Sequence, residues 1–236
     1  MTGVLSQLFD LSGRVAIVTG GSRGLGLQIA RALAEYGATV ALVARKQNEL
    51  DAAVESLTAE GRTAVGFAAD LGLPDAAQTV TARVLERFGR IDILVNNAGA
   101  AWGAAAEDYP LEGWNKVMDL NVTGLFLLTQ AVAREAFLKQ GKGAVVNLAS
   151  IEGLQGHHHT QLGTIAYNTA KGAVINMTRA LAAEWGPKNI RVNAVAPGYF
   201  PSKMTMATLG QHGEEMLRQT PLGKLGGDTD LMGPAL

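Results

Sequence analysis

The sequence predicts an α/β fold, a single Rossmann-type domain in which helices cover both faces of a doubly wound parallel sheet. Three observations favour it. Short β-branched runs alternate with longer amphipathic stretches. The first of these runs leads into a glycine-rich loop, TGGSRGLG, as in nucleotide-binding βα units. The 236 residues, 47% of them hydrophobic, suit one large core better than two small ones, so we expect one domain over residues 1–236.

The β-branched runs predict six strands, at residues 14–18, 39–43, 64–67, 92–95, 144–148 and 191–195. The first helix begins near Gly24, carries Leu25, Ile29 and Leu33 on one face, and ends at Gly37, a residue suited to a left-handed cap. Further helices are expected near residues 46–60, 74–88, 111–139 and 165–186. Crossovers of this length join parallel strands.

Composition excludes several classes of function. A formal net charge of −1 provides no basic surface for nucleic acid or for an acidic membrane, so we expect neither partner. The absence of cysteine excludes disulfides, zinc–thiolate sites and thiol catalysis. No run approaches about 18 apolar residues, and the N-terminus does not resemble a signal peptide. We therefore expect a cytoplasmic protein.

The loop after the first strand carries Gly20, Gly24 and Gly26 in the pattern G-x-x-x-G-x-G. The first glycine permits a tight turn, the second lets backbone amides approach phosphate oxygens, and the third allows close packing of the following helix. An ordinary βα turn is the alternative. The strand–loop–helix context favours a dinucleotide site.

Tyr167 and Lys171 stand four residues apart in a predicted helix and therefore share a face. An ammonium beside a phenol stabilises the phenolate and would lower the tyrosine pKa toward the working range of a proton-transfer catalyst. The pair is weak evidence by itself, because a half-buried aromatic and a solvated lysine would look the same. Its weight comes from the other motifs.

Six motifs occur in one order: TGGSRGLG, NNAG at residues 96–99, Asn121 in DLNVTG, Ser150 in NLASIEG, the Tyr167/Lys171 pair, and RVNAVAPGYFPSKM. In this the chain resembles the short-chain dehydrogenase/reductase family from about Ser12 to Ser202. The resemblance implies hydride transfer with four catalytic residues, Asn121, Ser150, Tyr167 and Lys171. Tyr167 would exchange the proton, Ser150 would bond the substrate oxygen, Lys171 would assist Tyr167 and hold the nicotinamide ribose, and Asn121 would hold a water that links Lys171 to solvent.

The end of the second strand indicates which nicotinamide nucleotide binds. It reads Ala44-Arg45-Lys46, without the carboxylate that would bond a ribose 2′-hydroxyl, and Arg23 can converge with Arg45 on a 2′-phosphate. We expect NADP(H) in preference to NAD(H), although both arginines could instead be solvated. The expected cofactor-binding residues are Gly20, Ser22, Arg23, Gly24, Leu25, Gly26, Arg45, Asp70, Leu71, Asn97, Ala98, Gly99, Tyr167, Lys171, Pro197, Gly198, Phe200 and Ser202. Asp70 could equally be a helix N-cap.

Two segments near the predicted site remain open to more than one interpretation. Residues 200–225, with several methionines among polar residues and glycines, predict a substrate lid or a plain surface helix pair. The segment between Ser150 and Tyr167 is about four residues longer than is usual in the family. It contains His157, His158 and His159, which as consecutive residues do not easily converge on one metal, so we expect a polar loop and no metal site.

The leading functional hypothesis is an NADP(H)-dependent oxidoreductase acting on a carbonyl or secondary alcohol, with a 3-oxoacyl or similar keto substrate. A polyol or sugar-acid dehydrogenase resembling gluconate 5-dehydrogenases is the alternative, and a non-catalytic NADP(H)-binding sensor or scaffold is a rival of another class. The family resemblance also implies a homotetramer or dimer, with an interface that uses Leu125, Phe126, Leu128, Ala131, Ala180, Leu181 and Trp185. The family's usual last strand has no counterpart here, so either the chain is truncated or a partner completes the sheet.

Overall fold

Six strands form one sheet in the order β3-β2-β1-β4-β5-β6, and every neighbouring pair is parallel. The computed structural model describes residues 3–156, 163–203 and 205–236. The strands are β1 (Val15–Thr19), β2 (Thr39–Ala44), β3 (Ala64–Ala68), β4 (Ile93–Asn96), β5 (Gly143–Leu148) and β6 (Ile190–Val195). Each coincides with a predicted strand to within about one residue at either end. The predicted doubly wound fold is confirmed.

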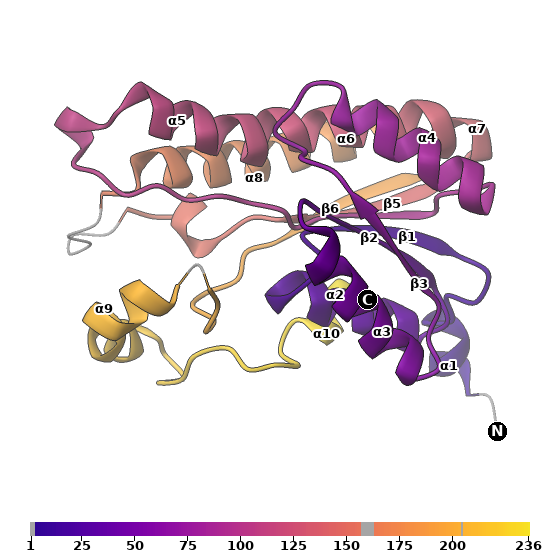
Figure 1. Ribbon diagram of the computed structural model, residues 1–236, viewed down its shortest axis with the longest axis horizontal. Coiled ribbons are helices and arrows are strands. Elements are labelled where there is room, and N and C mark those ends of the chain that lie inside the picture. The colour runs from indigo at the N-terminus through magenta and orange to yellow at the C-terminus, as the bar shows by residue number, and fades with distance from the viewer. Residues whose placement is uncertain (1–2, 157–162, 204) are drawn as a thin grey trace.

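Helices cover both faces of this sheet (Figure 1). On one face lie α4 (Ala76–Phe88), α5 (Leu111–Met118), α6 (Leu125–Val132), α7 (Leu138–Gln140) and α8 (Ile165–Trp185). On the other lie α1 (Val4–Leu8), α2 (Gly24–Glu35), α3 (Gln47–Ala59) and α10 (Met232–Ala235), while α9 (Met206–Gln219) lies apart from both layers. Gly37 follows α2 with a positive φ of 98°, as its predicted capping role requires.

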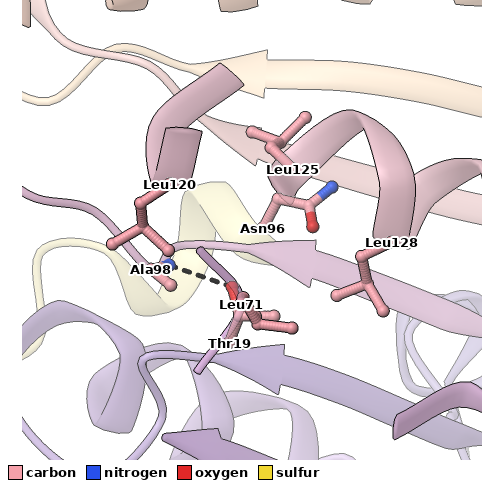
Figure 2. A pocket seen from close by; sticks show the side chains of 7 residues that line it. All are labelled: Thr19, Leu71, Asn96, Ala98, Leu120, Leu125 and Leu128. Atoms are coloured by element: carbon pink, nitrogen blue, oxygen red, sulfur yellow. Dashed lines mark hydrogen bonds between the residues drawn. The ribbon is translucent and has the colours of Figure 1, made fainter. Parts of the chain in front are cut away.

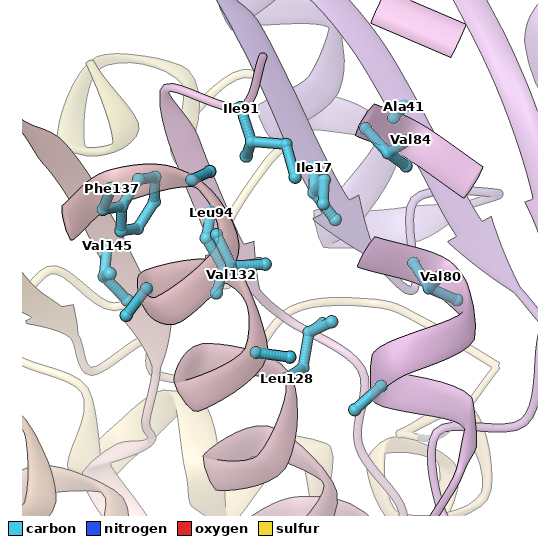
Figure 3. Packing of buried hydrophobic residues seen from close by; sticks show 14 of the residues in the cluster. Ile17, Ala41, Val80, Val84, Ile91, Leu94, Leu128, Val132, Phe137 and Val145 are labelled. Carbon is cyan, nitrogen blue, oxygen red and sulfur yellow. The ribbon is translucent and has the colours of Figure 1, made fainter. Parts of the chain in front are cut away.

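The strands alternate between two hydrophobic cores, one on each face. In β1, Ile17 enters the core beneath α4 and α6, whereas Ala16 and Val18 enter the core beneath α2 and α3. Figure 3 shows the first core, where Leu94 of β4 packs near Ile17 and against Val132 of α6. All five residues of β1 are buried, because a central strand of a doubly covered sheet has no solvent-facing side.

The helical stretch predicted over residues 111–139 is not a regular α-helix. Two π-helical segments, Asp119–Gly124 and Ala133–Phe137, interrupt it. Gly124 explains the close fit of the first one, since a Cβ there would come within 2.1 Å of the carbonyl oxygen of Leu71. Such segments are frequent at functional sites, and this one carries Asn121.

The predicted subunit interface needs a correction. Leu125, Leu128, Ala131, Leu181 and Trp185 are all less than 10% exposed and pack into the chain's own core. Phe126 is 38% exposed, and Ala180 is also exposed. The apolar excess on these helices therefore fills the space above the sheet.

The last part of the chain returns to the layer of α2. Leu231 and Ala235, at α10, are buried in the core beneath α2. Within the described residues, β6 forms one edge of the sheet and no strand follows it, as expected. None of the helices in the described ranges has the length and apolar character that a membrane crossing requires.

Candidate active site

The chain changes direction across the sheet between β1 and β4. From β1 it winds outward through β2 to β3, then returns to β4 on the other side and continues to β6. In open α/β sheets, ligands bind at this switch point, beyond the carboxyl ends of the strands. The glycine loop follows β1 here, Asn97 follows β4 and Ser150 lies just beyond β5.

The glycine loop fits a dinucleotide pyrophosphate. Gly20 and Gly24 have positive φ angles of 63° and 54°, and a Cβ at Gly26 would lie 2.3 Å from the carbonyl oxygen of Gly20. Arg23 at the N-cap of α2 makes no side-chain cap, and the first helical bond is from the Leu27 amide to the Arg23 carbonyl. The amides of the first turn thus remain available as donors to an anion.

Thr19 and Asn97 hold the loop against the end of β4. The Asn97 amide nitrogen Nδ2 donates to the carbonyl oxygen of Thr19 at 2.8 Å, and the backbone amides of Asn97 and Ala98 both donate to Thr19 Oγ1 at 2.9 Å. The side chain of Asn97, one of the predicted cofactor-binding residues, therefore braces the loop. Thr19 is not among the predicted site residues, although a polar residue that ends an apolar strand is a signal for such a role.

Figure 2 shows a small recess at this switch point, lined by Thr19, Leu71, Asn96, Ala98, Leu120, Leu125 and Leu128. Leu71 and Ala98 were predicted to bind the cofactor, and both lie at its wall. Ser150 and Tyr167 do not line it, so a substrate in contact with these two side chains would lie outside the recess.

Arg23 forms an ion pair at the end of β2, and its predicted convergence with Arg45 on a 2′-phosphate stays a prediction. Its guanidinium pairs with Glu49 Oε1 at 2.7 Å, and Lys46 reaches the same oxygen at 3.4 Å. Burial raises the pKa of the Glu49 carboxyl, but Arg23, Lys46 and Lys203 together hold it below its ordinary value. Glu49 is thus surrounded by positive charge at the end of β2. Arg45 is exposed beside this group and makes no ion pair with any described residue.

Asp70 makes a local turn, with Oδ1 accepting a hydrogen bond from the Gly72 amide at 3.0 Å. The alternative role considered for it, capping the next helix, is wrong because α4 begins at Ala76 with Asp75 in the N-cap position.

Ser150, Tyr167 and Lys171 are brought together. Ser150 lies two residues beyond the end of β5 and is 8% exposed, and its side chain is within hydrogen-bonding reach of Tyr167. Lys171 Nζ lies 5.5 Å from the centre of the Tyr167 ring and donates to the carbonyl oxygen of Leu148 at 2.6 Å. Burial lowers the pKa of Lys171 to about 8. The predicted cluster of phenol, hydroxyl and ammonium therefore exists.

The direction of the Tyr167 pKa differs from the sequence prediction. Burial raises the pKa of Tyr167, the hydrogen bond with Ser150 opposes this, and the negative charge of Glu152 raises it further. Lys171 directs its ammonium to a backbone carbonyl, so it does not provide the expected lowering of the Tyr167 pKa.

Asn121 is buried, with both ends of its amide engaged by Ala100. Its Oδ1 accepts from the Ala100 amide at 2.8 Å, and its Nδ2 donates to the Ala100 carbonyl at 2.9 Å. This pairing ties the segment after β4 to the π-helical turn, close to Gly99. The amide is thus structural, and the link to a water stays a prediction.

The turn Ile151–Gly153 packs directly on α8. A Cβ at Gly153 would come within 2.5 Å of the backbone of Lys171. Beside it, Asn168 Nδ2 donates to the Glu152 carboxylate at 2.9 Å. Glu152 and Asn168 were both missed by sequence reasoning, although each stands one or two residues from a predicted catalytic residue.

The segment after β6 lies next to the Ser150 turn, because the Ile151 amide donates to the Pro197 carbonyl at 3.1 Å. Gly198 faces Ile151. Ser202 hydrogen-bonds Thr205 through its hydroxyl, while the side chain of Phe200 is buried against Gly226. Phe200 is therefore a packing residue, and binding of the cofactor by Ser202 stays a prediction.

His157, His158 and His159 lie outside the described residues. Within the described ranges, no group of three or more His, Asp or Glu side chains is arranged to hold a metal ion.

A doubly wound parallel sheet with a glycine loop at its switch point and a buried Tyr–Lys–Ser cluster nearby defines a dinucleotide-binding oxidoreductase. The family model described as short chain dehydrogenase matches residues 14–212. The chain belongs to the short-chain dehydrogenase/reductase family, and it is an oxidoreductase acting on CH–OH or C=O groups.

Individual relatives divide between two kinds of substrate. Gluconate 5-dehydrogenase of Gluconobacter oxydans is 37% identical over 98% of this chain and 89% of its own length. The rhamnolipid-biosynthesis 3-oxoacyl-[acyl-carrier-protein] reductase of Pseudomonas aeruginosa is 39% identical over 92% of this chain and 86% of its own. A crystal structure of a gluconate 5-dehydrogenase from Burkholderia cenocepacia, in complex with NADP and tartrate, has a TM-score of 0.90 at 31% identity and covers 98% of this chain and 89% of that one.

Proposed function

We propose that the protein is an NADP(H)-dependent oxidoreductase that interconverts a carbonyl and a secondary alcohol on a small-molecule substrate. The observation that carries this proposal is that Ser150, Tyr167 and Lys171 lie together near the carboxyl ends of the strands, where the glycine loop also lies. The bound nicotinamide would supply or accept the hydride. Gly20, Gly24 and the first turn of α2 would hold its pyrophosphate.

The proton in this reaction is handled by the chain's own residues. Burial keeps the Tyr167 phenol protonated, so its hydroxyl can donate to a carbonyl oxygen during reduction. Ser150, hydrogen-bonded to Tyr167, would donate to the same oxygen as negative charge grows on it. Lys171, buried beside the ring with its ammonium bonded to the Leu148 carbonyl, would hold the nicotinamide ribose, as the family resemblance implies.

The positive group at the end of β2 supports NADP(H) over NAD(H). Arg23, Lys46 and Lys203 surround Glu49, and exposed Arg45 is adjacent. A 2′-phosphate carries close to two negative charges, and guanidinium groups match its geometry. The ion pair with Glu49 holds the Arg23 guanidinium near the end of β2, where it could bind a 2′-phosphate instead.

Two substrate classes remain in the proposal. The keto substrate of a 3-oxoacyl type agrees with one relative. A polyol or sugar-acid substrate agrees with the other, and one structural observation favours hydroxyl-rich molecules: Glu152, Asn168 and Tyr199 form a polar group beside Ser150. Carboxylate and amide groups bond hydroxyls well and offer little to an acyl chain.

The lid and the oligomer also stay proposals. Residues 200–225 contain α9, which lies apart from the sheet layers in Figure 1, with Met206 63% exposed and Met216 buried. Movement of this segment would open or cover the site. A homo-oligomer would use the exposed Phe126 and Leu138. The molecular mass in solution would give the number of subunits.

A panel of ketones and alcohols, assayed with both nicotinamide nucleotides, tests the function. We expect turnover with NADPH on at least one keto or keto-sugar substrate. Tyr167→Phe should lose about 100-fold or more of this activity while still binding the nucleotide. Tyr36→Phe, an exposed tyrosine at the end of α2, is the matched control. Nucleotide binding without turnover of any substrate would favour the sensor or scaffold.

A further inference from the structure

Glu152 occupies a junction between three segments of the site. It belongs to the turn Ile151–Gly153, and its backbone amide donates to Ser150 Oγ at 3.2 Å. Its carboxylate accepts a hydrogen bond from Asn168 Nδ2 on α8 at 2.9 Å and another from the Tyr199 hydroxyl at 3.2 Å. The turn after β5, the first turns of α8 and the loop after β6 therefore meet at one side chain.

The contacts around Glu152 fix the surroundings of Tyr167. Asn168 directly follows Tyr167 on α8, and its Nδ2 also donates to the backbone carbonyl of Glu152 at 2.9 Å. The opposite end of the Asn168 amide is bonded to Thr164 at 2.8 Å. Because the amide is held at both ends, the first turn of α8 cannot rotate without breaking these bonds. The relative position of Tyr167 and Ser150 is set by this arrangement.

The charge of Glu152 also reaches both neighbouring phenols. Burial raises the pKa of Tyr199 to about 12, with Glu152 adding to the shift, and Glu152 acts on Tyr167 in the same direction. Among the described residues, the other titratable groups around Tyr167 are Lys171 on the same helix and Tyr109, which packs in the same aromatic cluster.

We propose that Glu152 is a positioning residue of this site, whose carboxylate holds the Tyr167 turn against Ser150 and, through its charge, keeps the Tyr167 phenol in its protonated form. A phenol that retains its proton is a proton donor, so Glu152 favours carbonyl reduction over alcohol oxidation near neutral pH. This inference rests on the proposed reductase function. It adds that the direction of catalysis depends on a residue outside the Asn–Ser–Tyr–Lys set.

The test measures Tyr167 directly, without turnover. The pH dependence of phenolate absorbance is recorded for the protein without nucleotide and for Tyr167→Phe, and the difference isolates Tyr167. The same pair is measured in a Glu152→Gln background. Glutamine keeps an acceptor for Asn168 and Tyr199 and removes the charge. We expect the Tyr167 midpoint to move to lower pH, because the negative charge that disfavours the phenolate is gone. The acid limb of alcohol oxidation should move to lower pH by a similar amount.

Two further variants separate charge from structure. Glu152→Asp retains the charge and should keep the midpoint near the wild-type value, which also covers the case in which Glu152→Gln does not fold. Glu184→Gln removes an exposed carboxylate near the far end of α8, about 25 Å along the helix, and should change nothing. An unshifted Tyr167 midpoint in Glu152→Gln, or a shift in Glu152→Asp as large as that in Glu152→Gln, would overturn the inference. Absence of turnover with all substrates, with the midpoint still shifted, would instead contradict the proposed function.

Discussion

The ammonium of Lys171 donates a hydrogen bond to the carbonyl oxygen of Leu148, with 2.6 Å between nitrogen and oxygen. This bond joins the second turn of α8 to the last residue of β5, two residues before Ser150. It places a positive charge where the side chain is only 5% exposed. Burying a cation whose hydrogen-bond partner is a neutral carbonyl lowers the unfolding free energy. A catalytic role would explain why such a residue is present.

Lys171→Met should therefore stabilise the fold at neutral pH while abolishing turnover. Burial lowers the pKa of Lys171 to about 8 from 10.5, so charging it at pH 7 costs about 3 kcal/mol. In the variant, the Leu148 carbonyl loses its hydrogen-bond donor, and this loss offsets about 1–2 kcal/mol of the stabilisation. We expect a net gain of roughly 1–2 kcal/mol in unfolding free energy, measured by urea denaturation at pH 7.

The pH dependence of this gain follows from proton linkage. Between pH 8 and 10.5 the unfolded chain binds more protons at Lys171 than the folded one does, so wild-type stability rises with pH across that window. Methionine has nothing to titrate. The advantage of Lys171→Met should therefore shrink above pH 8 and be lost before pH 10.5, where only the loss of the Leu148 hydrogen bond remains. A constant difference across this range would show that burial of charge is not its cause.

Gly26→Ala should disrupt the nucleotide site by moving the backbone. Its Cβ would lie 2.3 Å from the Gly20 carbonyl oxygen, which is backbone, and 2.5 Å from Asn97 Nδ2, which is held by hydrogen bonds to the carbonyl oxygens of Thr19 and Gly20. We expect the unfolding free energy to fall by about 1–3 kcal/mol and nucleotide binding to weaken at least tenfold. Calorimetry measures the first effect and fluorescence titration the second. Gly210→Ala is the matched control, since its Cβ would meet nothing within 4 Å. Equal effects at the two glycines would contradict the loop's proposed role.

Much of this architecture was predictable because it depends on local patterns. A strand buried on both faces is a continuous apolar run, and a glycine with positive φ marks a turn, so β1 and Gly20 could both be located from the sequence. The four-residue spacing of Tyr167 and Lys171 likewise follows from helix geometry alone.

What could not be predicted depends on contacts between distant segments. Arg23 pairs with Glu49, 26 residues away, and no local pattern chooses that carboxylate over a solvated state. Asn121 bonds Ala100 because a π-helical segment turns it inward. The raised pKa of Tyr167 depends on burial and on Glu152, neither of which is visible in the spacing from Lys171.

Arg45→Asp should reverse the nucleotide preference. The substitution places a carboxylate at the end of β2, where it can accept hydrogen bonds from a ribose 2′-hydroxyl and repels a 2′-phosphate. We expect the ratio of kcat/KM for NADPH to that for NADH to fall by about 100-fold or more, equivalent to about 3 kcal/mol. Arg134→Asp, an exposed residue on the opposite helical layer, should leave the ratio unchanged. A ratio unaltered by Arg45→Asp would mean that Arg45 does not face the ribose.

Asn147→Leu should destabilise the protein through a buried network beneath the site. Asn147 Oδ1 accepts from Asn96 Nδ2 at 2.9 Å, and its own Nδ2 donates to Thr178 Oγ1 at 2.9 Å. Asn96 also donates to Thr129 at 2.8 Å. These bonds link β4 and β5 to α6 and to α8, the helix that carries Tyr167. Leucine cannot hydrogen-bond, so Asn96 and Thr178 each lose a buried partner. Each unsatisfied group costs about 1–3 kcal/mol of unfolding free energy.

The control for this network is Asn193→Leu, which makes the same chemical change at an exposed position of β6. It should alter the unfolding free energy by no more than about 0.5 kcal/mol. Because Thr178 anchors α8 through Asn147, the buried variant should also lower kcat with little change in KM at temperatures where it remains folded. Equal unfolding free energies for Asn147→Leu and Asn193→Leu would show that the amide contributes only volume to the core, and that the position of α8 is set by apolar packing alone.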